Sequence, residues 1–443
     1  MDISLTPEQE IILEEMIQGH NVFASGKAGC GKSRILAAFH EYAKRTKRNA
    51  VFLAPTGMAA LALPEAMTIH KFFEFSPQQV FVNEADVRES TRMRQKLEHV
   101  DTIVLDEVSM VRADIFQAMD VSLRKHTGCF NRPFAGKQVI VVGDFNQLPP
   151  VIDDPKIAEY LSYYYKGIYA FCTPVWNQLH FRSFFLTQIM RQTDQSYIEL
   201  LDALRTMKPG LKSMLQSAKF KVATCGADEI ALCCRNKEAA AINDTELARI
   251  KSSCYISNGL LTGRFPSSEL PTDRRLNLKQ TARVMVIQNQ RMSGGIPSRD
   301  CYANGELGSV LNIDPDSNTV TVRLDRGPRD VRVSFASWDD YLYDLLYDSQ
   351  NRPILKAEIV GRFYQFPLKL AWAISIHKAQ GQTLEKVHLR LGRGCFSPGQ
   401  LYTALTRVRN FDCLTLDRPI RYEDVLVDPQ VMAFHQDTFP NIY

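Results

Sequence analysis

The chain carries the stretch GKAGCGKS at residues 26–33, and this stretch decides its fold. A short apolar run leads into it, and a segment of helical period, SRILAAFHEYA, follows it. The stretch matches the pattern GxxxxGK(S/T) in full. In that pattern, glycines let successive backbone N–H groups turn toward phosphate oxygens, and the N-terminus of the next helix adds positive potential. The sequence therefore predicts a phosphate-binding loop between a strand and a helix.

The loop predicts a site for ATP and Mg²⁺. Lys32 is expected to hold the β and γ phosphates, and the hydroxyl of Ser33 is expected to ligate Mg²⁺. The other residues expected to contact the nucleotide here are Gly26, Ala28, Gly29, Cys30 and Gly31.

Two further apolar runs end in polar residues that suit the same chemistry. The run TIVL (102–105) leads into Asp106 and Glu107, which predicts a Mg²⁺ ligand and a base that activates water, respectively. The run VIVV (139–142) leads to Gln147, whose amide can bond both the γ phosphate and water. A surface glutamine in a proline-terminated turn is the alternative for Gln147. Together these elements predict an ATPase.

The order of the apolar runs predicts an α/β fold with parallel sheets. Expected strands at 21–24, 51–54, 102–105, 139–142 and 184–186 alternate with helical segments. A second such series begins at 229–233 and resumes at 370–375. Between them, alternation at 320–324 and 331–335 predicts a hairpin in a β-rich insertion, and WDDYLYDLLY (338–347) reads as an acidic amphipathic helix.

Composition sets limits on the class of protein. With 443 residues and roughly 150 per domain, about three units are expected. The excess of 53 basic over 49 acidic residues is too small to establish a polyanion partner. The ten cysteines form no CxxC pair and the start resembles no secretion signal, so we expect reduced thiols and a cytoplasmic protein. No apolar stretch approaches a membrane span.

The ordered motifs resemble those of a Pif-type superfamily 1B DNA helicase, related to the RecD and Dda helicases. The motifs are LTPEQ (5–9), GKAGCGKS, LAPTGMAA (53–60), TIHKFF (68–73), DEVSM (106–110), GDFNQLPPV (143–151), LTQIMRQ (186–192), FPLKLAWAISIHKAQGQTL (366–384) and GQLYTALTRVRN (399–410). They span about residues 5–410, nearly the whole chain.

The resemblance implies two RecA-like P-loop domains. The first would cover 1–188 with a small wedge insertion at 71–98. The second would cover 189–269 and 362–443, interrupted by a β-barrel-like insertion at 270–361. It also implies ATP-driven 5′-to-3′ movement on single-stranded DNA and unwinding of duplexes or structures such as quadruplexes, in replication, repair or recombination.

The resemblance assigns further residues to the nucleotide. Gln9 would read adenine, and Gly381 and Gln382 would approach the nucleotide from the second domain. Arg191 and Arg407 would reach across a cleft and stabilise transition-state charge. Each arginine taken alone reads as a surface residue.

The resemblance also assigns residues to DNA. Those in the first domain are Pro55, Thr56 and Met58, with His70, Phe72 and Phe73 nearby, and those in the second are His377, Lys378 and Thr383. From the residues alone, Phe72 and Phe73 read as core, or one as core and the other as exposed. His377 on an apolar segment reads as a satisfied core histidine.

Strand separation needs an obstacle, for which the insertion after His70 is the natural place. Its apolar run at 80–82 predicts a strand or hairpin tip, and an exposed Phe81 there would stack on the last base pair. The alternative is that Phe81 packs the insertion onto the first domain.

The expected partners are single-stranded DNA and junctions between single-stranded and duplex DNA. An RNA-dependent ATPase and a non-unwinding subunit that binds DNA ends are the alternatives. We expect a monomer, with a dimer on DNA as the other possibility, in a bacterial nucleoid or a virus-infected cell rather than a nucleus. The roles of the acidic segment 338–348 and the Tyr-rich segment 160–165 stay open.

Overall fold

The computed structural model describes residues 4–60, 63–75, 81, 87–152, 155–226, 228–265, 270–288, 302, 306–325, 329–347, 353–440 and 442. Within these ranges, the side chains of 57, 58, 155, 156, 160, 341–347 and 353–358 are not described. In the described part of the chain, no helix has both the length and the apolar character needed to cross a membrane.

A six-stranded parallel sheet forms the N-terminal part, in the order β3-β2-β4-β5-β1-β6. Its strands are β1 (Val22–Gly26), β2 (Ala50–Ala54), β3 (Met67–Thr68), β4 (Thr102–Leu105), β5 (Gln138–Val142) and β6 (Arg182–Leu186). All five strands predicted for this part are confirmed, to within two residues at each end. The parallel pairing places their carboxyl ends along one edge, where ligands of such sheets bind.

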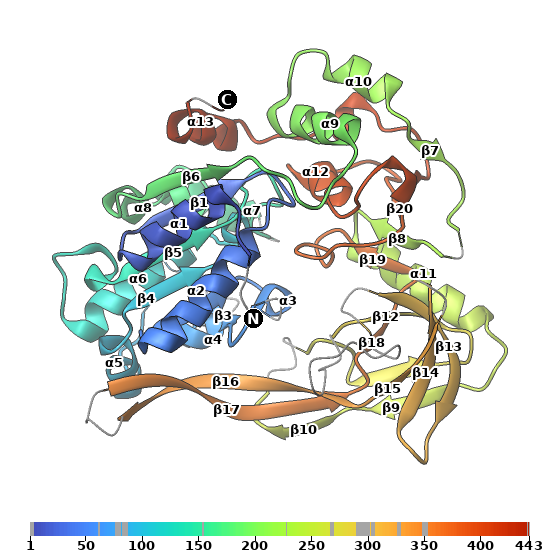
Figure 1. Ribbon diagram of the computed structural model, residues 1–443, viewed down its shortest axis with the longest axis horizontal. Helices are drawn as coiled ribbons and strands as arrows, with labels where there is room; N and C mark the ends of the chain where they lie inside the picture. The colour runs from blue at the N-terminus through green and yellow to red at the C-terminus, as the bar shows by residue number, and fades with distance from the viewer. Residues whose placement is uncertain are drawn as a thin grey trace.

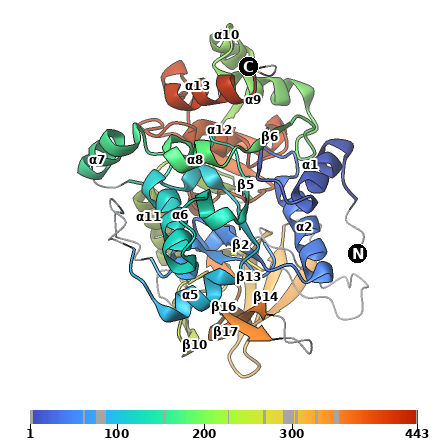
Figure 2. The same cartoon turned by 90° about the vertical axis from the view of Figure 1, so that its left-hand side faces the viewer.

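Helices cover both faces of this sheet (Figure 2). One face packs on α1 (Pro7–Ile17) and α2 (Lys32–Thr46) through one apolar cluster. The other face packs on α5 (Thr91–Glu98), α6 (Ala113–Thr127), α8 (Pro174–Gln178) and α13 (Pro429–Thr438). Because both faces are buried, the strands are almost continuously apolar, which is why the sequence revealed them. Shorter helices are α3 (Gly57–Ala60) and α4 (Ile69–Phe73), and α7 spans Pro155–Tyr165.

A second parallel sheet follows in the order β19-β8-β20-β21-β7. Its strands are β7 (Lys221–Val222), β8 (Ile230–Cys233), β19 (Ala373–Ser375), β20 (Val387–Arg390) and β21 (Leu414–Leu416). The helices are α9 (Gln195–Thr206), α10 (Leu211–Ser217), α11 (Asn236–Arg249) and α12 (Gln400–Leu405). The predicted α/β class, with two parallel sheets, is confirmed; Figure 1 shows the two sheets side by side. Residues from both sides line one cleft.

The region between β8 and β19 in the sequence is rich in antiparallel strands. They are β9 (Tyr255–Asn258), β10 (Leu260–Gly263), β11 (Arg275–Leu278), β12 (Arg283–Val286), β13 (Leu307–Asp314), β14 (Thr319–Leu324), β15 (Arg329–Ser334), β16 (Ala336–Tyr347), β17 (Pro353–Gln365) and β18 (Leu368–Leu370). Strands β12 to β15 and β18 form one sheet with its own apolar core. The predicted hairpin is confirmed as β14 and β15, in which Val322 lies opposite Val331.

The helix predicted at 338–347 is wrong, because this segment is strand β16. It pairs with β17 along its whole length, and the Trp338 ring stacks on Phe363 at 5.7 Å between centroids. The pattern of acidic and aromatic residues in this segment is compatible with either a helix or a strand. The segment forms a strand because its backbone hydrogen bonds with β17, which lies elsewhere in the sequence. The β16–β17 arm reaches the first sheet's helices (Figure 1), where Lys71 of α4 pairs with Asp340.

The expectation of an exposed aromatic at Phe81 is wrong as well, and the alternative, that Phe81 packs the insertion onto the first domain, is confirmed. Phe81 is 3% exposed, its ring lies 4.5 Å from that of Phe75, and its backbone N–H donates to Asp114 Oδ2 at 3.0 Å. Phe72 and Phe73 are also buried, at 0% and 4% exposed, so neither offers a free ring. A continuous apolar surface on the first sheet's helices takes up these rings. Val80 and Val82, the rest of the predicted tip, lie outside the described residues.

Burial of Phe81 leads to a stability prediction. Phe81→Ala should lower the free energy of unfolding by about 3 kcal/mol, because it removes a buried ring and leaves a cavity. Urea unfolding followed by circular dichroism measures this loss, and Phe130→Ala, at a ring that is 58% exposed, is the control. Any unwinding and ATPase activity of the kind that the resemblance implies should then fall together as the protein is destabilised. Selective loss of unwinding in a stable Phe81→Ala protein would restore the wedge role.

Candidate nucleotide and nucleic-acid sites

The phosphate-binding loop joins β1 to α2 and needs its glycines for two reasons. Gly29 and Gly31 have φ of +83° and +78°, which side chains with a Cβ rarely adopt. A Cβ at Gly29 would lie 2.7 Å from Arg191 Cβ, and one at Gly31 would lie 2.6 Å from Gln9 Nε2. The glycines therefore allow residues from other elements to approach the loop closely.

Lys32 lies inside the loop. Its Nζ donates to the carbonyl oxygens of Gly26 at 3.0 Å and Lys27 at 3.1 Å. The loop borders a cleft of about 790 Å³ that residues from both parallel sheets line. From the first sheet's side come 28–34, Asp106, Glu107 and Gln147, and from the second sheet's side 380–383, Arg407 and Arg409. The sequence-predicted nucleotide residues thus line one cleft, except Gly26 and Gln9, which are not part of its lining.

Gln9 reaches the loop from α1. Thr6 and Gln9 form a capping box, which starts the helix and sets the direction of the Gln9 side chain. Gln9 is fully buried, and its Nε2 donates to the Cys30 carbonyl oxygen at 3.0 Å. The Met190 backbone N–H donates to the Gly29 carbonyl at 2.9 Å. The residue assigned to adenine by resemblance therefore lies against the nucleotide loop.

Two adjacent carboxylates project into the cleft from the end of β4. The backbone N–H of Glu107 donates to Asp106 Oδ1 at 2.8 Å, and Glu107 has a φ of +49°. A left-handed non-glycine residue costs about 1–3 kcal/mol, and such strain clusters at functional sites. Burial, together with the neighbouring Glu107, raises the pKa of Asp106 to about 7. A bound cation would remove that unfavourable crowding of negative charge.

The donors beside the loop suit Mg²⁺. Ser33 and Asp106 both line the cleft and offer oxygen atoms, which Mg²⁺ prefers, and phosphate oxygens and water complete its usual shell. The buried, crowded carboxylates are the feature that a cation fits. Ser33 and Asp106 are therefore the residues that could hold the metal, which stays a prediction.

Two of the arginines that line the cleft are the buried Arg407, after α12 on the second sheet's side, and the half-buried Arg191, between β6 and α9. Arg407 is 2% exposed, and it donates to Gln147 Oε1 at 3.3 Å and to the Gln382 carbonyl at 3.2 Å. Arg191 donates to the Thr406 carbonyl at 3.0 Å. Burial and the neighbouring Arg191 lower the pKa of Arg407. Two guanidinium groups brought together beside the cleft could hold an anion such as a γ phosphate.

Two residues beside the nucleotide loop, Gln380 and Tyr402, had no role predicted from the sequence. Gln380 Nε2 donates to Glu107 Oε2 at 3.1 Å. The Tyr402 hydroxyl accepts from the Ala28 backbone N–H and bonds Asp144 Oδ2, both at 3.2 Å. Tyr402 and Gln380 lie in motifs named above, but only the packing of the sheets shows that they touch the loop and Glu107.

The residues assigned to DNA in the first domain lie beside the cleft's edge. Pro55 and Thr56 border a hollow of about 160 Å³ whose lining also includes Met110 and Arg112. His70 is half-buried, and burial together with Arg112 lowers its pKa. Neutral His70 can accept or donate a hydrogen bond to a base or sugar. The side chain of Met58 lies outside the described residues.

In the second domain, an aromatic stack lies beside the DNA candidates. The half-buried His377 ring stacks on Phe396 at 6.4 Å, and the Arg235 guanidinium lies 4.8 Å from the Phe396 ring centre. Phe396 is 52% exposed, while Lys378 and Thr383 are exposed. Burial lowers the pKa of His377. Neither Phe396 nor Arg235 could be predicted from the sequence, because neither belongs to a motif or a repeated pattern.

Comparison with known proteins identifies relatives over nearly the whole chain. Residues 4–206 match the family model described as PIF1-like helicase. The ATP-dependent DNA helicase Pif1 of Bdellovibrio bacteriovorus is 30% identical over 98% of this chain and 92% of that protein. The ATP-dependent DNA helicase PIF1 of Xenopus laevis is 28% identical over 98% of this chain, which spans 64% of that protein's length.

Solved structures share the fold. The crystal structure of Bacteroides sp Pif1 in complex with ADP-AlF4 has a TM-score of 0.83 and 30% identity, covering 98% of this chain and 97% of that one. The structure of Bacteroides Pif1 bound to ssDNA has a TM-score of 0.66, also at 30% identity, covering 99% and 98%. The likeness supports the assignment of two RecA-like domains.

Proposed function

Because the chain belongs to the PIF1-like helicase family, we propose that it is an ATP-dependent DNA helicase that moves 5′ to 3′ along single-stranded DNA. The observation that carries the proposal is the single cleft in which Lys32 and Glu107 face Arg407 from the other sheet. Two motor domains, 1–188 and 189–269 with 362–443, would close on ATP there. The β-rich segment at 270–361 would be an insertion in the second.

ATP hydrolysis follows from the side chains around this cleft. Lys32 would neutralise the β and γ phosphates, and Ser33 and Asp106 would hold Mg²⁺, which stabilises charge on the phosphates. Glu107 would accept a proton from the attacking water, and Gln147 would orient that water. Arg407 and Arg191 would stabilise charge that develops on the γ phosphate.

Contacts between the two sheets couple hydrolysis to movement. Gln380 touches Glu107, Arg407 touches Gln147, and Tyr402 touches Ala28. Each contact joins a residue that senses the nucleotide to an element of the second sheet. A change at the γ phosphate would therefore shift one domain against the other, and this shift would alter the affinity of each domain for the DNA strand.

Single-stranded DNA would pass beside the same two sheets. Pro55, Thr56 and His70 would contact it from the first domain, and Lys378 and Thr383 from the second. The structure resembles the Bacteroides protein with ADP-AlF4 more than the one with ssDNA, at TM-scores of 0.83 and 0.66. We infer that DNA binding changes the domain arrangement here too.

Phe396 would serve as a platform for a base. It is half-exposed, Arg235 and His377 hold it in place, and an unstacked base can lie on such a ring. Phe396→Ala should weaken binding of oligo-dT by about 1–3 kcal/mol, or about 5- to 150-fold. Fluorescence anisotropy measures this loss, with Tyr422→Ala, at an aromatic that is 43% exposed, as the control. Equal affinity in the Phe396 variant and wild type would remove Phe396 from the DNA path.

The ATPase response to different strands tests the substrate class. Oligo-dT should stimulate ATP hydrolysis strongly, whereas oligo-U of equal length should do so weakly. Stronger stimulation by oligo-U would favour the RNA-dependent alternative. DNA binding without any ATPase stimulation would favour the non-unwinding, end-binding alternative.

A further inference from the structure

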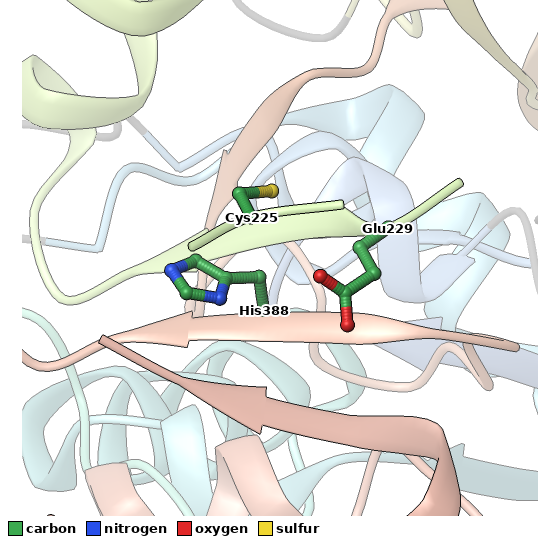
Figure 3. Close-up of side chains that lie close together, drawn as sticks. All are labelled: Cys225, Glu229 and His388. Carbon is green, nitrogen blue, oxygen red and sulfur yellow. The ribbon is translucent and has the colours of Figure 1, made fainter. Parts of the chain in front are cut away.

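Cys225, Glu229 and His388 lie together on the second parallel sheet (Figure 3). One thiol sulfur, one carboxylate oxygen and one ring nitrogen all lie within 4.8 Å of one another. The three residues are up to 163 positions apart, so no spacing in the sequence revealed them.

This cluster is on the side of the sheet away from the nucleotide cleft. Glu229 directly precedes β8, and His388 is the second residue of the parallel strand β20, so both lie near the amino ends of their strands. The cleft residues 380–383 instead follow the carboxyl end of β19. The cluster therefore has no part in the proposed ATP chemistry.

Thr415 of β21 already organises two of the three side chains. Its hydroxyl donates to Glu229 Oε1 at 2.8 Å and contacts His388 Nδ1 at 2.9 Å. The Gly226 backbone N–H donates to Glu229 Oε2 at 2.6 Å, which folds the β7–β8 loop back on itself. This fold keeps Cys225, on the same loop, beside the other two.

The cluster is open to solvent on one side, where Cys225 is exposed, so a cation can enter it. His388 is 3% exposed and lies on a rigid strand, Glu229 is half-buried, and Cys225 is exposed at the rim. A fixed imidazole at the base with a movable thiol above it can close on an ion arriving from solvent. Zinc donors lie about 3.5 Å apart, so only a small rotation of Cys225 and Glu229 is required.

The donor set indicates which cation binds. Sulfur, imidazole nitrogen and carboxylate oxygen together suit Zn²⁺, whereas Mg²⁺ and Ca²⁺ take oxygen donors. A thiolate and a carboxylate also supply two negative charges that balance the ion. The nearby Asp228 pairs with Lys386 and adds no further charge.

We propose that Cys225, Glu229 and His388 bind a zinc ion, with water at the fourth position. The ion links the β7–β8 loop to β20 and stabilises the second sheet at the amino ends of β8 and β20. Binding only exchanges the thiol proton for the metal and involves no redox change. The proposal does not rest on the ATPase, so it can fail while the proposed function stands.

Zinc affinity of the full chain tests the proposal. The protein, without an affinity tag and stripped of metal, is titrated with Zn²⁺ against a chromophoric chelator. Wild type should bind one zinc per chain with high affinity, and Cys225→Ser should weaken that affinity by more than about 10-fold. Cys254→Ser, at another exposed cysteine, is the matched control and should bind as wild type does.

Cobalt substitution identifies the ligands directly. Co²⁺ bound to wild type should show a thiolate-to-cobalt charge-transfer band that Cys225→Ser loses and Cys254→Ser keeps. Glu229→Gln should weaken zinc binding while it keeps the chain folded, since its amide oxygen can still accept from Thr415. Equal zinc affinity in wild type, Cys225→Ser and Glu229→Gln, or no saturable zinc in wild type, would overturn the proposal.

Discussion

Lys32→Ala should abolish the proposed ATP hydrolysis and strand separation, while the protein should stay folded and still bind single-stranded DNA. The lysine sits inside the loop, within 3.1 Å of two of its carbonyl oxygens, where the β and γ phosphates of ATP are expected. Without its charge the phosphates lose their main cationic partner, and the transition state loses more than the ground state.

Steady-state ATPase with saturating oligo-dT measures this effect, and thermal unfolding checks the fold. Lys44→Ala, at the far end of the same helix, is the control because its side chain pairs with Glu65 on the surface. ATPase close to that of the control in Lys32→Ala would remove the loop from the chemistry.

Arg407→Ala should lower kcat by about 10³- to 10⁵-fold, with a smaller effect on ATP affinity. Its guanidinium is buried beside Gln147 and comes from the second sheet's side of the cleft. Arg407 should stabilise the transition state more than bound ATP, because its guanidinium would contact the negative charge that develops on the γ phosphate during hydrolysis.

Burial of Arg407 also supports the structure, so the test needs a second variant. Arg407→Lys keeps a cation and should remain folded, yet lose most of kcat because a lysine cannot make the same set of hydrogen bonds. Arg393→Ala, on the exposed loop before α12, is the control. Loss of ATP affinity with unchanged kcat in both Arg407 variants would give this arginine a binding role instead.

The phosphate loop, the buried parallel strands and the β14–β15 hairpin could be predicted from the sequence, because each depends on residues that are close together in the chain. The phosphate loop and the strands that precede Asp106 and Gln147 carry signals within a few residues, because a buried parallel strand must be apolar along its length. The predicted hairpin at β14 and β15 was found for the same reason, since its alternation reports one buried face. These signals predicted Lys32 and Glu107 at one sheet edge, whereas Arg407, which lines the same cleft, was assigned only by the resemblance to a helicase family.

The features that depend on distant partners were missed. β16 becomes a strand through pairing with β17, and Phe81 is buried against an apolar surface already formed by the first sheet's helices. Tyr402 gains its role from a contact with Ala28, 374 positions away. A single residue in an ordinary segment carries no sign of such a contact, so only the folded chain shows it.

The most direct test of the proposed 5′-to-3′ helicase activity is unwinding of duplexes that carry a single-stranded tail of one polarity. Two duplexes of the same sequence, one with a 5′ tail and one with a 3′ tail, are incubated with the protein, Mg²⁺ and either ATP or a non-hydrolysable analogue. The proposed ATP-dependent movement from 5′ to 3′ predicts that the 5′-tailed duplex is unwound with ATP, and that neither duplex is unwound with the analogue. Unwinding of only the 3′-tailed duplex, or of neither duplex with ATP, would contradict it.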